Sequence, residues 1–179
     1  MSAADGPPAN APAWRGDDVP GEGRLLGIDY GEKRLGFALS TPEQNLSTPL
    51  ETWTRRGESV DARRLREIGE EYCVKGIVVG LPLHSWGDEG TSAHRAREFG
   101  KWVKETLRLP VTFWDERCSS AAADDWMMAA NLSRDQRRAR RDMLAAHVIL
   151  QSFLDRRRAL LSGDDAPGSD EHDESAEEE

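Results

Sequence analysis

Apolar and polar positions along the chain predict two consecutive strands near the start of an ordered region. The run Leu25–Ile28 is almost continuously apolar, which is typical of a strand covered on both faces. In Leu35–Ser40, large apolar residues alternate with small ones, which predicts a second strand. Because only a few residues separate the two runs, the strands are expected to form an antiparallel hairpin.

The pattern downstream predicts three more strands and four helices. Short continuous apolar runs indicate strands, and apolar residues every three or four positions indicate helices. Pro49 places the third strand at a sheet edge or near its own start. In chain order we expect a strand at 47–53, a helix at 60–72 begun by Ser59, a strand at 76–81, a helix at 93–107, a strand at 111–114, a helix from Ser119 or Ser120 to 130, and a helix from Ser133 to 160.

This order predicts an α/β fold with one mixed five-stranded sheet and helices on both faces. The first, fourth and fifth strands are expected to be parallel and central. Ligands of such sheets bind beyond the carboxyl ends of the parallel strands. We therefore expect Asp29, the loop at 80–83 and Glu116 to lie together.

Charge divides the chain into a central domain and two tails. Residues 1–23 are rich in Ala, Pro, Gly and Asp and are predicted to be disordered. Residues 163–179 contain nine acidic residues and no Lys or Arg, so they are predicted to form an acidic, disordered tail. The whole chain of 179 residues has a net charge of −9, but residues 24–162 contain 20 acidic and 23 basic residues. A mildly basic domain at 24–162 is compatible with nucleic acid as a partner.

The two cysteines, Cys73 and Cys118, are too far apart in the sequence to indicate a zinc motif or a disulfide framework. Isolated cysteines are compatible with a reducing cytoplasm, where we expect the protein to act. The sequence contains no apolar run of about 18 residues, so no membrane-spanning segment is expected.

Three acidic residues are candidates for a metal site. Asp29 ends a strand in the middle of the predicted sheet, where it either caps the turn at Gly31 or binds a cation. Glu116 ends the fifth strand. Asp142 begins the helical stripe that continues through Ala145, Ala146, Ile149 and Phe153, so it is expected to face the sheet unless it pairs with Arg138 one turn earlier.

If the three carboxylates converge, they would suit a hard divalent cation such as Mg²⁺ or Mn²⁺, which could support phosphodiester hydrolysis. Basic residues lie near each acid in the sequence, and they could contact phosphate groups. The alternative is that the arginine run is a solvated helix face. The candidate nucleic-acid-binding residues are Lys33, Arg34, Arg117, Arg138, Arg140 and Arg141.

Four motifs resemble those of one family, in the same order: GIDYGEKRLGFALS, VVGLPL with the following Gly-Asp-Glu-Gly, DERCSS, and RRDMLAAHVIL. Together they are similar to the YqgF/RuvX family over about residues 24–158. That resemblance implies an RNase H-like fold and an acidic triad at Asp29, Glu116 and Asp142. Members are described as Holliday junction resolvases and as nucleases that mature the 5′ end of precursor 16S ribosomal RNA.

Two classes of function therefore stay open at this stage. The first is a metal-dependent nuclease acting on structured RNA, with precursor ribosomal RNA as the expected substrate, or on branched DNA. The second is a non-catalytic module that binds nucleic acid. The sequence does not distinguish a monomer from a homodimer.

Overall fold

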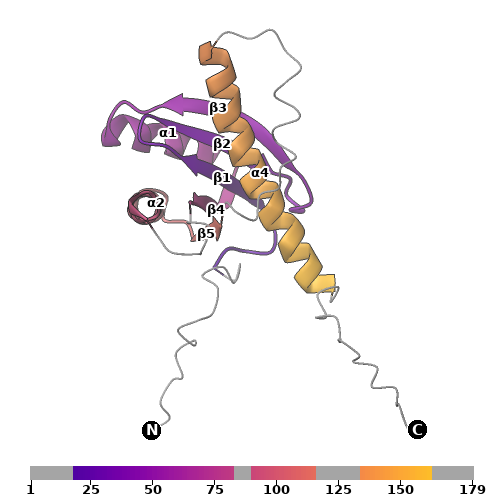
Figure 1. The fold of residues 1–179 in the computed structure, drawn as a ribbon. Coiled ribbons are helices and arrows are strands. Elements are labelled where there is room, and N and C mark those ends of the chain that lie inside the picture. Colours follow the sequence, from indigo (N-terminus) through magenta and orange to yellow (C-terminus); the bar gives the residue numbers. More distant parts are fainter. Residues whose placement is uncertain (1–17, 83–89, 116–133, 163–179) are drawn as a thin grey trace, which may run out of the picture.

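The computed structural model describes residues 18–82, 90–115 and 134–162, and within the last segment it describes side chains from Met143 onward. Eight elements lie in these ranges (Figure 1). They are β1 (Arg24–Tyr30), β2 (Arg34–Ser40), β3 (Ser47–Thr54), α1 (Glu58–Glu71), β4 (Val74–Leu81), α2 (Thr91–Leu107), β5 (Val111–Asp115) and α4 (Arg134–Ser162). All five predicted strands and three of the four predicted helices are confirmed. The helix predicted at 119–130 lies outside the described residues.

The sheet has the strand order β3-β2-β1-β4-β5. The pairs β1–β2 and β2–β3 are antiparallel, whereas β1–β4 and β4–β5 are parallel. This is the mixed five-stranded sheet that the sequence predicted. One detail of the prediction was wrong, because β5 forms an edge of the sheet and only β1 and β4 are central among the parallel strands. Pro49 does lie in an edge strand, β3, beside a register shift.

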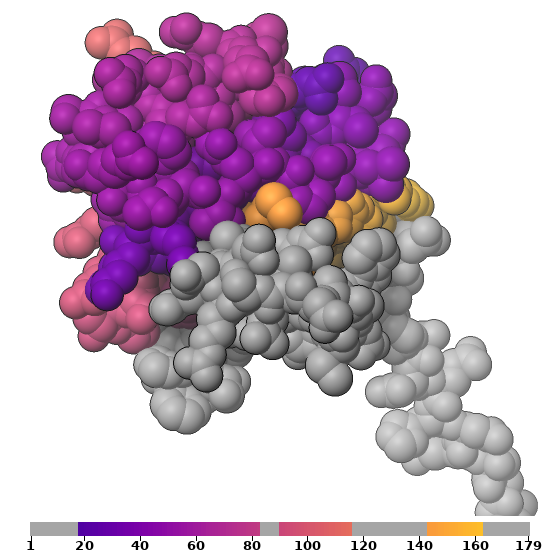
Figure 2. All heavy atoms as spheres, turned by 90° about the horizontal axis from the view of Figure 1, so that it is seen from above, coloured from indigo at the N-terminus to yellow at the C-terminus, as the bar shows by residue number. Residues whose placement is uncertain are grey.

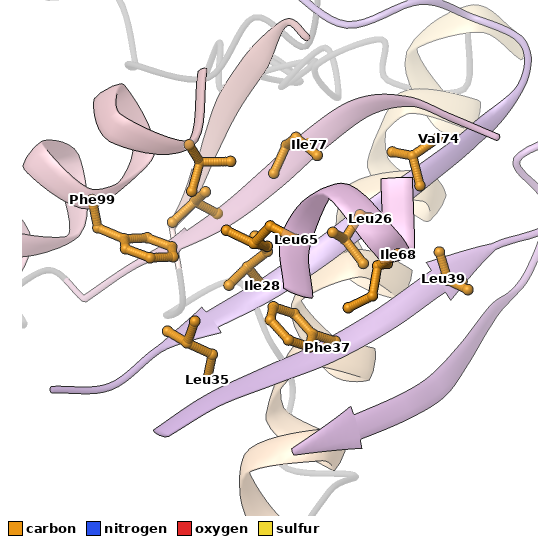
Figure 3. Close-up of a cluster of buried hydrophobic side chains, with 12 residues drawn as sticks. Leu26, Ile28, Leu35, Phe37, Leu39, Leu65, Ile68, Val74, Ile77 and Phe99 are labelled. Carbon is orange, nitrogen blue, oxygen red and sulfur yellow. The ribbon is translucent and has the colours of Figure 1, made fainter. Parts of the chain in front are cut away.

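One face of the sheet packs against α1 and α2 around a large hydrophobic core. Side chains of β1, β2 and β4 meet Leu65 and Ile68 of α1 and Phe99 and Val103 of α2 (Figure 3). On β1 this core takes Leu26 and Ile28, the residues at even positions. The odd positions of β1 must therefore face the opposite side of the sheet.

The opposite face is covered by α4, which lies across the strands in Figure 1. Leu25, Ala38, Val78 and Trp114 contribute one residue from each of four strands to this second core. From the helix it takes Ala146, Ile149, Leu150, Phe153 and Leu154. Three residues of the predicted stripe, Ala146, Ile149 and Phe153, are thus buried against the sheet.

The beginning of the domain lies earlier than residue 24. Residues 18–23 were expected to belong to the N-terminal tail, but Val19 is only 3% exposed and belongs to the α4 core. Arg157 of α4 donates hydrogen bonds to the carbonyl oxygens of Val19 and Pro20, at 3.0 and 2.9 Å. Gln44 donates a further bond to the Pro20 oxygen at 2.9 Å. The described part of this segment is therefore fixed by contacts with residues far away in the sequence.

The start of α1 also differs from the prediction. Ser59 was expected to cap the helix, but the N-cap is Gly57, whose φ of 107° is a conformation that favours glycine. Ser59 therefore lies within the first turn. No helix among the described residues is long and apolar enough to cross a membrane.

Candidate active site at the carboxyl end of β1

Asp29 lies near the end of the central strand β1 and is half-buried. Its position has the same parity as Leu25, which belongs to the α4 core, and as Gly27. Strand alternation therefore places Asp29 on the face that α4 covers. The position expected from the sequence, at the end of a strand in the middle of the fold, is confirmed.

Glycines surround Asp29 on this face of the sheet. Gly27 precedes it by two residues, and Gly36 is its partner on β2. On β4, Gly80 follows Val79, which is the partner of Ile28. Because glycine has no side chain, these neighbouring strand positions do not cover the Asp29 carboxylate from the sheet. A ligand or another backbone can approach this part of the sheet closely.

Helix α4 packs on the middle of β1, at Gly27. A Cβ atom on Gly27 would lie 2.7 Å from the Leu150 Cβ and 3.1 Å from the Ala146 carbonyl oxygen, so the helix packs directly on the β1 backbone there. Beyond the amino end of β1, Arg157 of α4 donates hydrogen bonds to the carbonyl oxygens of Val19 and Pro20. The helix therefore crosses β1 with its higher-numbered residues toward the amino end of the strand and its lower-numbered residues toward Asp29.

This direction brings the backbone of residue 142 toward Asp29. Asp142 lies one turn before Ala146, which corresponds to about 6 Å along the helix axis. Asp29 lies two residues beyond Gly27, which corresponds to about 6.6 Å along the strand. The displacement from Ala146 to Asp142 and the displacement from Gly27 to Asp29 both lead toward the carboxyl end of β1. The described backbone is therefore compatible with the predicted convergence of Asp29 and Asp142.

The end of β5 is held against the same helix by Trp114. Its indole Nε1 donates a hydrogen bond of 2.7 Å to the Ser152 hydroxyl, and its ring meets Phe153 edge to face with centroids 5.6 Å apart. The next residue, Asp115, is the partner of Leu81, and Leu81 packs on the α2 side of the sheet. Glu116 and Arg117 follow Asp115 and lie outside the described residues.

The proposed acidic triad thus stays a prediction. Among the described side chains, no group of three or more His, Cys, Asp and Glu residues could hold a metal ion. That search does not cover Glu116 or the side chain of Asp142. The pairing of Asp142 with Arg138, the alternative considered from the sequence, is not tested for the same reason.

The predicted basic residues lie at two places. Lys33 is exposed in the β1–β2 turn, and Arg34 begins β2 as the partner of Thr54. Arg138, Arg140 and Arg141 lie in the first half of α4, as expected, but their side chains lie outside the described part.

A buried carboxylate that sequence reasoning missed lies near the same end of the sheet. Asp61 of α1 is 0% exposed and accepts hydrogen bonds from Trp53, Arg55 and the Arg56 backbone. Burial alone would raise the pKa of Asp61, but together these three donors outweigh it and hold the pKa below its ordinary value. An acid in the first turn of a helix normally faces solvent, so its position alone gave no signal. The tryptophan and the two consecutive arginines just before the helix were the available signal.

Comparisons with known proteins agree with this architecture. A family model described as "RuvX: Holliday junction resolvase" matches residues 23–156. A protein of Clostridium botulinum (strain Alaska E43 / Type E3) is 42% identical over 133 residues, which cover 74% of this chain and 97% of that protein. A protein of Rhodopseudomonas palustris (strain TIE-1) is 41% identical over 141 residues, covering 79% and 88%. Both carry the name "Putative pre-16S rRNA nuclease".

Among solved structures, RuvC of T. thermophilus in complex with a Holliday junction substrate aligns with a TM-score of 0.49 and 13% identity, covering 75% of this chain and 96% of RuvC. The family model covers residues 23–156, which extend from β1 into most of the α4 helix. This chain therefore belongs to the RuvX family.

Proposed function

We propose that this protein is a metal-dependent nuclease that hydrolyses phosphodiester bonds at the 5′ end of precursor 16S ribosomal RNA. The observation that carries the proposal is the setting of Asp29: a half-buried carboxylate at the end of a central strand, with glycines beside it and α4 running toward it. The names of the curated relatives support the substrate. Ribosomal RNA processing would place the protein in the cytoplasm.

Asp29 fits a divalent cation by its chemistry and its surroundings. A carboxylate is the preferred ligand type of Mg²⁺ and Mn²⁺, and the glycines leave its approach from the sheet uncovered. We assign Asp29, Glu116 and Asp142 as the residues that would hold the metal. Thr112 and Trp114 lie on the α4 side of β5, so continued alternation would bring position 116 to that side too.

Bound Mg²⁺ or Mn²⁺ would supply an activated water and stabilise the oxygen that leaves. The protein's own groups would orient the substrate. Because β1 and α4 are packed without an intervening side chain at Gly27, the positions of Asp29 and Asp142 are coupled to the core. The predicted phosphate contacts would hold the nucleic acid backbone over these acids. These contacts are assigned to Lys33, Arg34, Arg117, Arg138, Arg140 and Arg141.

The decisive experiment is cleavage of a structured RNA that carries the precursor 5′ leader. We expect cleavage with Mg²⁺ or Mn²⁺ and none with chelator. Asp29→Asn, Glu116→Gln and Asp142→Asn should each abolish cleavage and leave RNA binding nearly unchanged. Asp115→Asn is the matched control, because Asp115 adjoins Glu116 but lies on the α2 side of the sheet. Cleavage by all three acid variants at the parent's rate would contradict the proposal.

A second candidate is cleavage of a four-way DNA junction, because the matching family model is described as a Holliday junction resolvase. The junction is tested beside the RNA with the same variants. Symmetric cleavage of a junction would require two copies of the chain, so the oligomeric state is measured with and without the junction. If both substrates are bound and neither is cut, the protein is a nucleic-acid-binding module without nuclease activity.

A further inference from the structure

Arg55 is held in one orientation by the buried carboxylate of Asp61. The Arg55 Nε donates to Asp61 Oδ2 at 3.2 Å, while Asp61 Oδ1 accepts bonds from the Trp53 indole at 2.9 Å and the Arg56 backbone N–H at 3.0 Å. The carboxylate therefore joins the end of β3 to the first turn of α1. A side chain with 0% exposure and three donors has little freedom to rearrange.

Two aromatic rings also lie against the Arg55 guanidinium. Its Cζ atom lies 5.7 Å from the centroid of Tyr30 and 5.7 Å from that of Phe99. The side chain is 24% exposed. Within the described part of the chain, its Nη1 and Nη2 groups donate no hydrogen bond.

Lys33 and Arg56 lie next to Arg55 and are exposed. The Arg55 backbone N–H donates to the Lys33 carbonyl at 3.0 Å, which ties the end of β3 to the β1–β2 turn. Arg56 lies over the Trp53 ring at 5.7 Å. Among the described residues, neither Lys33 nor Arg56 has an acidic partner. We call Lys33, Arg55 and Arg56 the β3–α1 basic corner.

This corner lies at the same end of the sheet as Asp29. Tyr30, whose ring lies against the Arg55 guanidinium, directly follows Asp29 in β1. Tyr30 belongs to the α1 and α2 side of the sheet, whereas Asp29 belongs to the α4 side. Strand β3 packs against α4, and in Figure 2 the purple residues, which include β3 and α1, meet the orange residues of α4. A nucleic acid strand that crosses the end of β1 at Asp29 would meet this corner on the side away from α4.

We propose that Lys33, Arg55 and Arg56 form a phosphate-binding site for the nucleic acid strand cleaved at Asp29, with Asp61 as the positioning residue of Arg55. The proposal rests on the nuclease function proposed above. A guanidinium can donate two parallel hydrogen bonds to one phosphate. Because Asp61 and the two rings already restrict Arg55, it loses little conformational freedom when phosphate binds.

The test measures equilibrium binding of the structured RNA in the Asp29→Asn background, which keeps the substrate uncut, over a range of salt concentrations. Arg55→Ala should weaken binding about tenfold and reduce the salt slope by about 0.7 to 0.9. Lys33→Ala should act in the same direction and does not disturb Asp61. Lys75→Ala is its matched control, because Lys75 is an exposed lysine at the opposite end of the sheet, and it should bind within about twofold of the parent.

Asp61→Asn distinguishes the role of Asp61 in orienting Arg55 from the effect of its negative charge on RNA binding. The substitution removes a negative charge beside the corner, so electrostatics alone would tighten RNA binding. Loss of the Arg55 orientation should instead weaken binding, with the salt slope reduced. Arg55→Lys should keep most of the salt slope but lose affinity, because an ammonium group cannot donate the two parallel hydrogen bonds of a guanidinium to one phosphate. Thermal melts establish that each variant is fully folded at the assay temperature.

The proposal is overturned if Arg55→Ala and Lys33→Ala bind like Lys75→Ala, or if Asp61→Asn binds more tightly than the parent. These outcomes are independent of cleavage. If Asp29→Asn abolishes cleavage but the corner variants bind normally, only the phosphate site is wrong. If the corner variants lose affinity but no substrate is ever cut, the phosphate site stands and the nuclease function is wrong.

Discussion

Substitution of Gly27 by alanine should destabilise the domain by overpacking β1 against α4. The new Cβ would lie 2.7 Å from the Leu150 Cβ and 3.1 Å from the Ala146 carbonyl oxygen. Neither atom belongs to the flexible end of a side chain, so relief requires α4 to move away from β1 as a unit. Overpacking of this kind costs about 1 to 3 kcal/mol of unfolding free energy.

Urea denaturation measures this cost from the midpoint, provided that the slope of the transition is unchanged. Gly69→Ala is the matched control. Its Cβ would meet only Leu107 Cδ2 at 3.8 Å, an ordinary contact, and Gly69 lies within α1. Alanine should stabilise the protein there by up to about 1 kcal/mol because of its higher helix propensity. If Gly27→Ala leaves the unfolding free energy unchanged or raises it, the close packing of α4 on β1 is wrong.

Three further predictions follow from other parts of the molecule. Asp61→Asn should lower the unfolding free energy by about 2 kcal/mol near neutral pH. Because the pKa of Asp61 is lowered in the folded protein, its stabilising contribution is present above the ordinary pKa of 3.8 and is lost as the pH falls through the folded pKa. Urea titrations in which the difference between the variant and the parent does not shrink below about pH 4 would refute this. Arg157→Ala removes hydrogen bonds to the Val19 and Pro20 carbonyl oxygens, so the backbone amides of residues 18–23 should exchange hydrogen faster. Arg158→Ala is the control, because the hydrogen bond that it removes goes to Asn45. Deletion of residues 163–179 should tighten RNA binding at low salt, with a smaller gain near 1 M salt, where the Debye length is about 3 Å. Equal affinities of the full-length and truncated proteins at low salt would show that these acidic residues do not compete with RNA for the basic residues of the domain.

The strands and helices could be predicted from the sequence because their apolar periods are long and regular. The period-two pattern of β2 indicates a strand, and the shortness of the β-branched run in β4 favours a strand over a buried helix; the structure confirms both. Val19 could not be predicted in the same way. One apolar residue in a segment rich in Pro, Gly and Asp has no period, and its burial depends on Arg157, 138 residues later.

The position of Asp29 could be predicted because it depends on strand order, whereas its surroundings depend on the register between strands and could not be predicted. Asp29 ends an apolar run, so its place at the end of a strand followed from the sequence. Its glycine neighbours Gly36 and Gly80 come from two other strands, and only the observed register makes them neighbours. The start of α1 was misplaced because Ser59 was taken as the N-cap, and Asp61 gave no signal of its own. Its inward position could be recognised only once Trp53 and Arg55 were seen to converge on it.

The packing at Gly27 links the stability of the fold to the chemistry proposed for it. Glycine within a strand is unfavourable by roughly 0.5 to 1 kcal/mol relative to alanine, so its presence requires a compensating gain. The gain here is the direct contact of β1 with α4, which fixes the distance between the strand that carries Asp29 and the helix that carries Asp142. Displacement of reacting groups by about 1 Å can reduce a catalysed rate about 100-fold. Gly27→Ala should therefore reduce cleavage far more than its modest effect on stability would suggest, whereas a core variant away from this contact, such as Ile68→Val, should lower stability and leave the rate of the folded protein unchanged.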